Sequence, residues 1–286
     1  MSRIIVVVGP TASGKSAYAV DLAQRLGGEV ISADSRQVYR GLDVGSGKIT
    51  KREMRGVPHH MLDVADPKKT FTAHDYVRLA RPILEDILSR GKTAIICGGT
   101  GFYIDALLGR ISLPDVPRNE KLRARLAKKA APVLHRLLAR KDPRRAASID
   151  RHNPVRLIRA LEIAATLGHV PPSTQATARH ITDYVEWIGI ERTQDELRSR
   201  IHARLLARMR SGMLAEAKRL HARGLSYRRM EELGLEYRYL ARLLRGTVTK
   251  AQFLQELEAE ILRYAKRQRT YWRRHKLIRW LELTNR

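Results

Sequence analysis

The chain of 286 residues is long enough for one large domain with an insertion, or for two domains. Its 55 Lys and Arg residues outnumber 29 Asp and Glu residues, and the formal net charge of +26 favours a polyanionic partner, above all nucleic acid, over a surface of merely solvated arginines. One cysteine, Cys97, excludes intrachain disulfides and cysteine-cluster zinc sites, and no apolar run approaches the roughly 20 residues that span a bilayer, so we expect a cytoplasmic protein without a membrane partner.

The N-terminus predicts a phosphate-binding loop. The hydrophobic run Ile4–Val8 reads as a buried strand, too short for a signal sequence, and a helical pattern follows over Lys15–Leu26. Between them stands Gly-x-x-x-x-Gly-Lys-Ser, the P-loop pattern, formed by Gly9, Pro10, Thr11, Ala12, Ser13, Gly14, Lys15 and Ser16. Loop N–H groups, the helix N-terminus and Lys15 would bind a di- or triphosphate, and the Ser16 hydroxyl would hold Mg²⁺.

The first third of the chain continues this alternation of strands and helices. The next expected elements are a strand at Glu29–Ala33, an irregular segment at Gly41–Asp66, a helix near Tyr76–Ser89, a strand at Thr93–Cys97 and a helix near Phe102–Leu108. Such alternation predicts an α/β fold with a P-loop NTPase-like core, a parallel sheet flanked by helices.

Asp34 directly follows the second strand, which would place it at the same sheet edge as the P-loop, where ligands bind. A turn or helix cap is the alternative role for this residue. The strand Thr93–Cys97 ends in Gly98-Gly99-Thr100-Gly101 rather than in an Asp for Mg²⁺, which argues against a motor-type ATPase.

The pattern then becomes helical. We expect an all-helical insertion domain at 113–183 and a catalytic core formed by 1–112 and 184–286. A strand returns at Val185–Ile190, and from Gln194 onward the chain is expected to be helical. The stretch Arg263–Arg274 mixes cations with aromatic side chains, which suits either RNA contact or a core helix with arginines outside.

Several motifs together resemble one family. They are Gly9–Ser16, Ser32–Gly45, His59–Asp63, Gly98–Tyr103, Asn153–Glu162, Gly234–Tyr237 and Tyr264–Gln268. In order and spacing they resemble the tRNA dimethylallyltransferases (isopentenyl-tRNA transferases) of the bacterial type without a zinc finger. That family transfers a dimethylallyl group from dimethylallyl diphosphate to the exocyclic N6 amine of adenine 37, next to the anticodon of tRNAs reading codons that begin with U. Its P-loop holds the leaving diphosphate and does not split ATP.

The resemblance implies a set of site residues. The catalytic residues would be Asp34 as general base, Thr100 and Lys15, with the diphosphate on Gly9–Ser16 and Mg²⁺ at Ser16. The tRNA contacts, to the anticodon stem-loop, would be Asp34, Ser35, Arg36, Gln37, Thr100, Arg123, Val155, Arg156 and Arg159. Gln37 would read adenine, since a carboxamide both donates and accepts on that base. We expect the protein to act as a monomer.

This sequence departs from the family in two places, and other functions remain open. Gly45-Ser46-Gly47-Lys48 stands where the family often has Gly-Thr-Ala-Lys, and Val155 replaces a common polar residue. From the residues alone, the alternative role of Thr100 is to shape a Gly-rich turn, and the alternative for Arg156 and Arg159 is an i,i+3 surface pair. The alternative functions are a P-loop small-molecule kinase and a nucleotide-switched RNA-binding protein.

Overall fold

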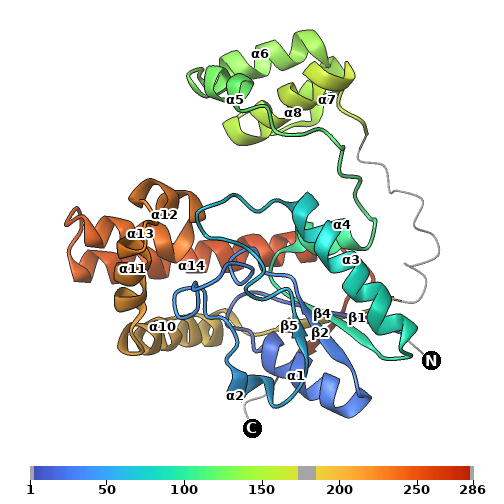
Figure 1. Cartoon of the computed structure of the whole chain (residues 1–286), viewed down its shortest axis with the longest axis vertical. Helices are drawn as coiled ribbons and strands as arrows, with labels where there is room; N and C mark the ends of the chain where they lie inside the picture. The colour runs from blue at the N-terminus through green and yellow to red at the C-terminus, as the bar shows by residue number, and fades with distance from the viewer. Residues whose placement is uncertain (1–2, 173–184, 284–286) are drawn as a thin grey trace. The chain divides into compact units, whose positions relative to one another are not determined.

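The structure, a computed structural model, describes residues 3–172 and 185–283. The chain divides into two compact units, one made of Met1–Leu108 with Ala178–Arg286 and the other of Gly109–Thr177 (Figure 1). Within the described residues, no helix combines the length and the apolar character needed to cross a membrane.

The first unit is built on a six-stranded sheet in the order β3-β2-β4-β1-β5-β6, in which every neighbouring pair is parallel. Its strands are β1 (Ile4–Val8), β2 (Glu29–Ser32), β3 (His59–His60), β4 (Ala94–Cys97), β5 (Val185–Glu191) and β6 (Arg279–Glu282). The central strand β1 pairs through Ile5 with Ile95 on one side and Glu186 on the other. The predicted α/β fold class is confirmed.

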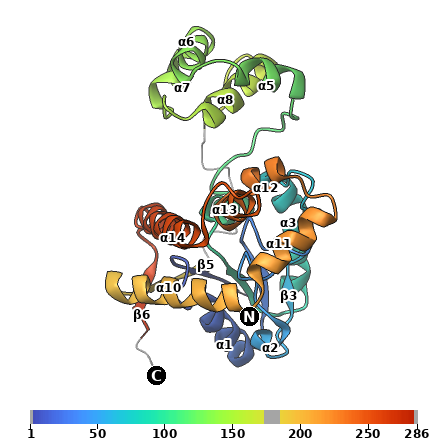
Figure 2. The ribbon, with the colours of Figure 1, turned by 90° about the vertical axis from the view of Figure 1, so that its left-hand side faces the viewer.

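Helices cover both faces of this sheet (Figure 2). They are α1 (Lys15–Leu26), α2 (Lys51–Met54), α3 (Ala73–Ser89), α4 (Gly101–Leu107), α10 (Gln194–Arg210), α11 (Met213–Ala222), α12 (Tyr227–Leu233), α13 (Leu235–Leu244) and α14 (Lys250–Trp272). Because side chains alternate along β1, Val6 packs with Trp187 under α3 and the C-terminal helices, whereas Ile5 packs with Val20 of α1. Burial on both faces explains the unbroken apolar run of the first strand.

Two predictions about the ends of the sheet are wrong. The chain is not helical throughout from Gln194, because β6 pairs with the second half of β5 at the sheet edge. The segment Gly41–Asp66 is not wholly irregular, because it contains α2 and the two-residue edge strand β3.

Of the aromatic residues in α14, Trp272 is fully buried, and the Tyr271 hydroxyl donates to Asp105.

The second unit contains four helices in its described part, with a core of its own. They are α5 (Glu120–Ala127), α6 (Ala131–Lys141), α7 (Pro143–Ser148) and α8 (Pro154–Leu167). Leu134, Leu138 and Leu157 are completely buried in its apolar cluster. The side chains of Asn119, Asp142 and Asn153 cap the N-termini of α5, α7 and α8, which fixes where these helices begin.

Candidate functional site

A pocket lies where β1, β2 and β4 end, and it contains both predicted elements of the site. It encloses about 550 Å³, part of which is open solvent. The lining residues are Thr11, Lys15, Ser16, Ala19, Val30, Ser32, Asp34, Gln37, Ser46, Ile49, His59, Cys97, Gly98 and Arg204. The P-loop and Asp34 therefore face one cavity, as the parallel strand order requires.

The P-loop has a backbone shape that only glycine permits at its start. A Cβ atom on Gly9 would lie 2.5 Å from the carbonyl oxygen of Ile190 in β5. Lys15, the first residue of α1, is half-buried, and its Nζ donates to the Pro10 carbonyl at 3.3 Å. Burial lowers the pKa of Lys15, and the nearby Cys97 and Asp34 oppose that change. An incoming anion would therefore find a poorly solvated ammonium group, which strengthens their attraction.

Side chains from distant parts of the first unit hold the P-loop. Arg200 Nε donates to the Ala12 carbonyl at 2.9 Å, and Arg192 Nε donates to the Ser13 carbonyl at 3.4 Å. Because these two carbonyl oxygens already accept from cations, their repulsion of a bound anion is reduced. Arg192 lies between β5 and α10, and Arg200 lies in the second turn of α10. The sequence analysis identified neither of them.

Asp34 serves as a turn cap and a pocket residue at once. Its Oδ1 accepts hydrogen bonds from the backbone N–H groups of Arg36 at 2.8 Å and Gln37 at 3.3 Å. Such an Asx turn fixes the carboxylate against its own backbone. Asp34 therefore caps its turn and also lines the pocket, and its role as general base remains a prediction.

Thr100, the N-cap residue of α4, ties the loop after β4 to the Asp34 turn. Its Oγ1 accepts from the backbone N–H of Ser35 at 3.0 Å, and its own N–H donates to the Ala33 carbonyl at 3.1 Å. Burial raises the pKa of Tyr264 in α14, whose hydroxyl lies near Thr100. Thr100 therefore shapes the turn that carries Ser35, and it lies beside the pocket residue Asp34.

The remaining residues of this segment have different surroundings. Gln37 lines the pocket and donates from Nε2 to the Gly47 carbonyl at 3.4 Å. Arg36 donates instead to the carbonyl of Ser35 at 3.0 Å and is absent from the pocket lining. Arg204 of α10, which the sequence analysis missed, lines the pocket and donates to the same Gly47 carbonyl at 3.0 Å. Burial lowers the pKa of Arg204.

In the second unit, two of the predicted tRNA-binding arginines surround a buried carboxylate. Glu162, 1% exposed, accepts from Arg123 Nη2 at 2.7 Å and from Arg159 Nη1 at 2.5 Å, as well as from the backbone N–H of Asn119. Burial alone would raise its pKa, but these hydrogen bonds outweigh burial and lower the pKa of Glu162 to about 2. Val155 and Arg156, at the start of α8, are exposed.

The pocket offers few ligands to a metal ion. Among the residues that the structure describes, no three His, Cys, Asp or Glu side chains gather into a metal cage. The Ser16 hydroxyl and the Asp34 carboxylate both line the pocket, and both are hard oxygen donors of the kind that Mg²⁺ prefers. Mg²⁺ usually completes its coordination with substrate phosphates and water, so this donor set fits the ion.

Comparison with known proteins identifies close relatives. Residues 37–275 match the family model described as IPP transferase. The chain is 41% identical over 272 residues to tRNA dimethylallyltransferase 2 of Treponema denticola, covering 94% of this chain and 91% of that protein. It resembles the crystal structure of the full-length tRNA isopentenylpyrophosphate transferase of Bacillus halodurans, with 36% identity, a TM-score of 0.72 and coverage of 98% and 89%. A eukaryotic dimethylallyltransferase acting on tRNA shares the fold, with a TM-score of 0.81 at 24% identity, over all of this chain and 75% of that one.

Proposed function

This chain belongs to the IPP transferase family, and from that premise we propose that it transfers a dimethylallyl group from dimethylallyl diphosphate to tRNA. The acceptor is the N6 amine of adenine 37, beside the anticodon of tRNAs reading codons that begin with U, and diphosphate is released. The observation that carries the proposal is the pocket shared by the P-loop and Asp34. We propose further that the protein works as a monomer in the cytoplasm, where its tRNA substrate is found.

The P-loop would stabilise the departing diphosphate. As the C–O bond of the donor breaks, negative charge grows on the phosphate oxygens, and Lys15 together with the loop N–H groups offsets it. The interactions of Arg200 and Arg192 with the loop carbonyls keep this cradle in one shape before the donor arrives. Such preorganisation means that no energy is spent on rearranging the loop during the reaction.

Asp34 would remove the proton from the attacking amine. The lone pair of the adenine N6 amine is delocalised into the ring, so the amine needs a base as the new C–N bond forms. The Asx turn fixes Oδ1, and proton transfer to Oδ2 leaves that turn intact. In the transfer step, the C–O bond of dimethylallyl diphosphate breaks, the C–N bond to adenine forms, and the amine proton passes to Asp34. Through its hydrogen bond with the Ser35 N–H, Thr100 would hold the Asp34 turn in place next to the reacting amine.

Mg²⁺, when bound, would supply positive charge to the diphosphate, with the Ser16 hydroxyl as its protein ligand and Asp34 within the same cavity. Ser16 is the second residue of α1, so its hydroxyl stands beside the helix N-terminus that also favours phosphate.

The tRNA would contact both units. In the second unit, the exposed Arg156 and Val155 are available at the start of α8, and Arg156 suits a phosphate. Arg123 and Arg159 already bind Glu162, yet each guanidinium has five N–H donors and can also reach RNA. In the first unit, Gln37 lines the pocket, and Ser35 stands in the sequence between the pocket residues Asp34 and Gln37. The target adenine must flip into this pocket, because its amine is out of reach while the base is stacked.

One experiment separates this function from the kinase and the switch. The protein is incubated with Mg²⁺, dimethylallyl diphosphate and an unmodified tRNA transcript, and nucleosides from the digested tRNA are weighed by mass spectrometry. We expect adenosine to gain one dimethylallyl group, and a transcript with guanosine at position 37 to gain none. Phosphate transfer from ATP without prenylated adenosine would favour the kinase instead.

A further inference from the structure

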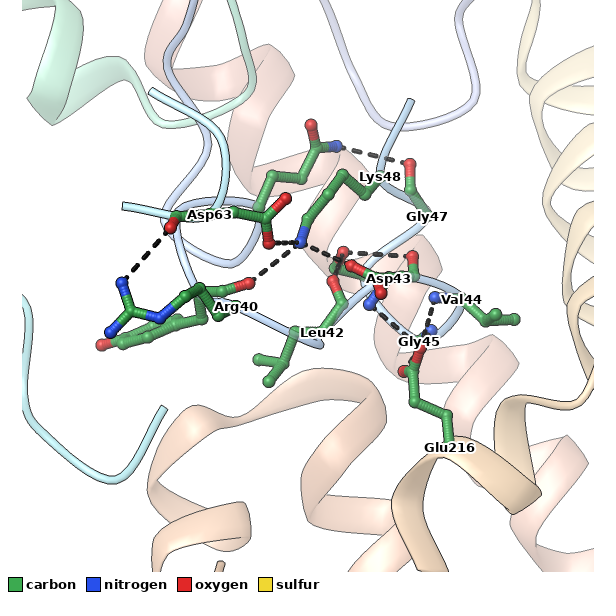
Figure 3. A network of polar contacts seen from close by, with 12 residues as sticks. Arg40, Leu42, Asp43, Val44, Gly45, Gly47, Lys48, Asp63 and Glu216 are labelled. Carbon is green, nitrogen blue, oxygen red and sulfur yellow. Dashed lines mark hydrogen bonds and ion pairs between the residues drawn. The ribbon is translucent and has the colours of Figure 1, made fainter. Parts of the chain in front are cut away.

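The loop Asp43–Lys48, here called the 43–48 loop, wraps around one buried carboxylate. Glu216 of α11 accepts hydrogen bonds from three successive backbone N–H groups: those of Asp43 at 3.0 Å, Val44 at 2.7 Å and Gly45 at 2.9 Å (Figure 3). The Tyr237 hydroxyl donates to the same carboxylate at 2.7 Å. Consecutive N–H groups aimed at one point form a nest for an anion, and here the anion belongs to the protein itself.

This arrangement allows little variation. Glu216 is 2% exposed, so its charge would be costly without these four donors, and losing them would leave a buried carboxylate unpaired. A Cβ atom on Gly45 would lie 2.6 Å from the Tyr237 hydroxyl oxygen and 3.1 Å from Glu216 Oε1, so no larger residue fits there. On the other side of the loop, Lys48 Nζ donates to Asp43 at 2.6 Å and to Asp63 at 2.5 Å (Figure 3).

The 43–48 loop also contacts residues that line the pocket. Gly47 lies in the same tight turn, because its N–H donates to the Val44 carbonyl at 3.1 Å. The Gly47 carbonyl in turn accepts from Gln37 Nε2 at 3.4 Å and from Arg204 Nη2 at 3.0 Å. One hydrogen of the Gln37 amide is therefore directed at Gly47, which fixes how the carboxamide is turned in the pocket.

We propose that Glu216 is a positioning residue for recognition of the acceptor base. By holding the N–H groups of Asp43–Gly45 it sets the Gly47 carbonyl, and this carbonyl orients Gln37. The inference rests on the proposed function, because it assigns Gln37 the task of reading the adenine. It follows that Glu216 controls the use of tRNA and leaves the binding of dimethylallyl diphosphate unaffected.

A double-mutant cycle tests this chain of contacts. Glu216→Gln keeps the side-chain volume but turns an amide NH₂ toward backbone donors, so the loop must shift. We expect the KM for tRNA to rise about tenfold while the KM for dimethylallyl diphosphate stays constant, because one base contact contributes about a 10- to 100-fold preference. In a Gln37→Ala background, the same substitution should cost less than about twofold, since residues acting through one contact are not additive.

Two further variants keep the test decisive. Tyr237→Phe removes one donor to Glu216 and leaves the three backbone bonds, so we expect a smaller effect in the same direction. Glu29→Gln alters another buried carboxylate, which binds Arg90, Lys92 and His60, and it should lower stability without a selective change in tRNA use. Two outcomes would overturn the inference. In the first, the increases in the KM for tRNA caused by Glu216→Gln and by Gln37→Ala multiply in the double variant. In the second, Glu216→Gln changes the KM values for tRNA and for dimethylallyl diphosphate equally. Absence of prenylated adenosine from the unsubstituted protein would overturn the proposed function instead.

Discussion

The side-chain oxygen of Gln268 accepts a 2.8 Å hydrogen bond from the backbone N–H of Thr11, which joins α14 to the P-loop. Its Nε2 donates to the Gly99 carbonyl at 3.0 Å. One buried carboxamide thus connects the loops that follow β1 and β4. The amide makes both bonds because its oxygen accepts and its nitrogen donates.

Gln268→Glu should weaken binding of the donor substrate. The carboxylate still accepts from Thr11, but it has no hydrogen for the Gly99 carbonyl and repels that oxygen. We expect the KM for dimethylallyl diphosphate to rise about tenfold, corresponding to about 1.4 kcal/mol, in initial-rate measurements at saturating tRNA. Gln252→Glu is the matched control, since Gln252 belongs to the capping box of the same helix and Glu serves equally there. Equal KM values for the two variants would contradict this role.

Asp34→Asn should abolish most of the chemical step and leave the fold intact. The amide oxygen still accepts from Arg36, so the Asx turn survives, but an amide cannot take the proton of the amine. We expect the single-turnover rate to fall by about 10²- to 10⁴-fold, the usual contribution of a general base. The Kd for tRNA should change little in a filter-binding assay. A rate within a few-fold of the unsubstituted protein would show that another group accepts the proton.

The charge of Lys15 should set the alkaline limit of donor binding. Since burial lowers its pKa below the usual 10.5, the ammonium loses its proton at a lower pH than an exposed lysine does. We therefore expect the KM for dimethylallyl diphosphate to increase as the pH rises through this lowered pKa. The arginine in Lys15→Arg keeps its charge throughout the same pH range. The KM of this variant for dimethylallyl diphosphate should therefore not change with pH, even if it differs from that of the unsubstituted protein. Parallel pH profiles for the two proteins would contradict the assignment.

Glu162 should make the second unit sensitive to acid. Its pKa is lowered from 4.5 to about 2, so its stabilising effect is complete above pH 4.5 and is lost as the pH falls toward 2. The total is roughly 3 kcal/mol by linkage. Hydrogen exchange of the α8 amides measures it, and the difference between wild type and Glu162→Gln should shrink over that range. Glu120→Gln, an exposed pair with Arg118, should show no such change.

The fold and the centre of the site could be predicted because their signals are local. A five-residue apolar strand, a glycine-rich loop and an amphipathic helix stand next to one another at the N-terminus, and Asp34 lies two residues after the second strand. Parallel pairing then brings these parts to one edge without further information. The strands β3 and β6 escaped prediction because each is short and lies at an edge, where pairing with a neighbour decides the structure.

The supporting residues could not be predicted because their partners are distant backbone groups. Glu216 is one acidic residue in an ordinary helix, and only the folded chain shows the loop N–H groups around it. Arg204 lies beside the apolar stripe of its helix and looks like a solvated arginine. Arg123 and Arg159 were predicted as tRNA contacts, a role that remains a prediction. The bond from Arg123 to Glu162 depends on the packing of α5 against α8, whereas Arg159 and Glu162 are three residues apart within α8.

The order of the strands has a consequence for synthesis on the ribosome. β1 emerges early, yet its partner β5 follows only after the whole second unit, and β6 comes later still. A nascent chain that ends at α8 therefore has an N-terminal sheet with an unpaired edge, which invites aggregation. The second unit has its own apolar core, so it can fold before β5 is translated. Chaperone demand in the cell should accordingly peak between translation of α8 and of β5, before the P-loop strand is enclosed.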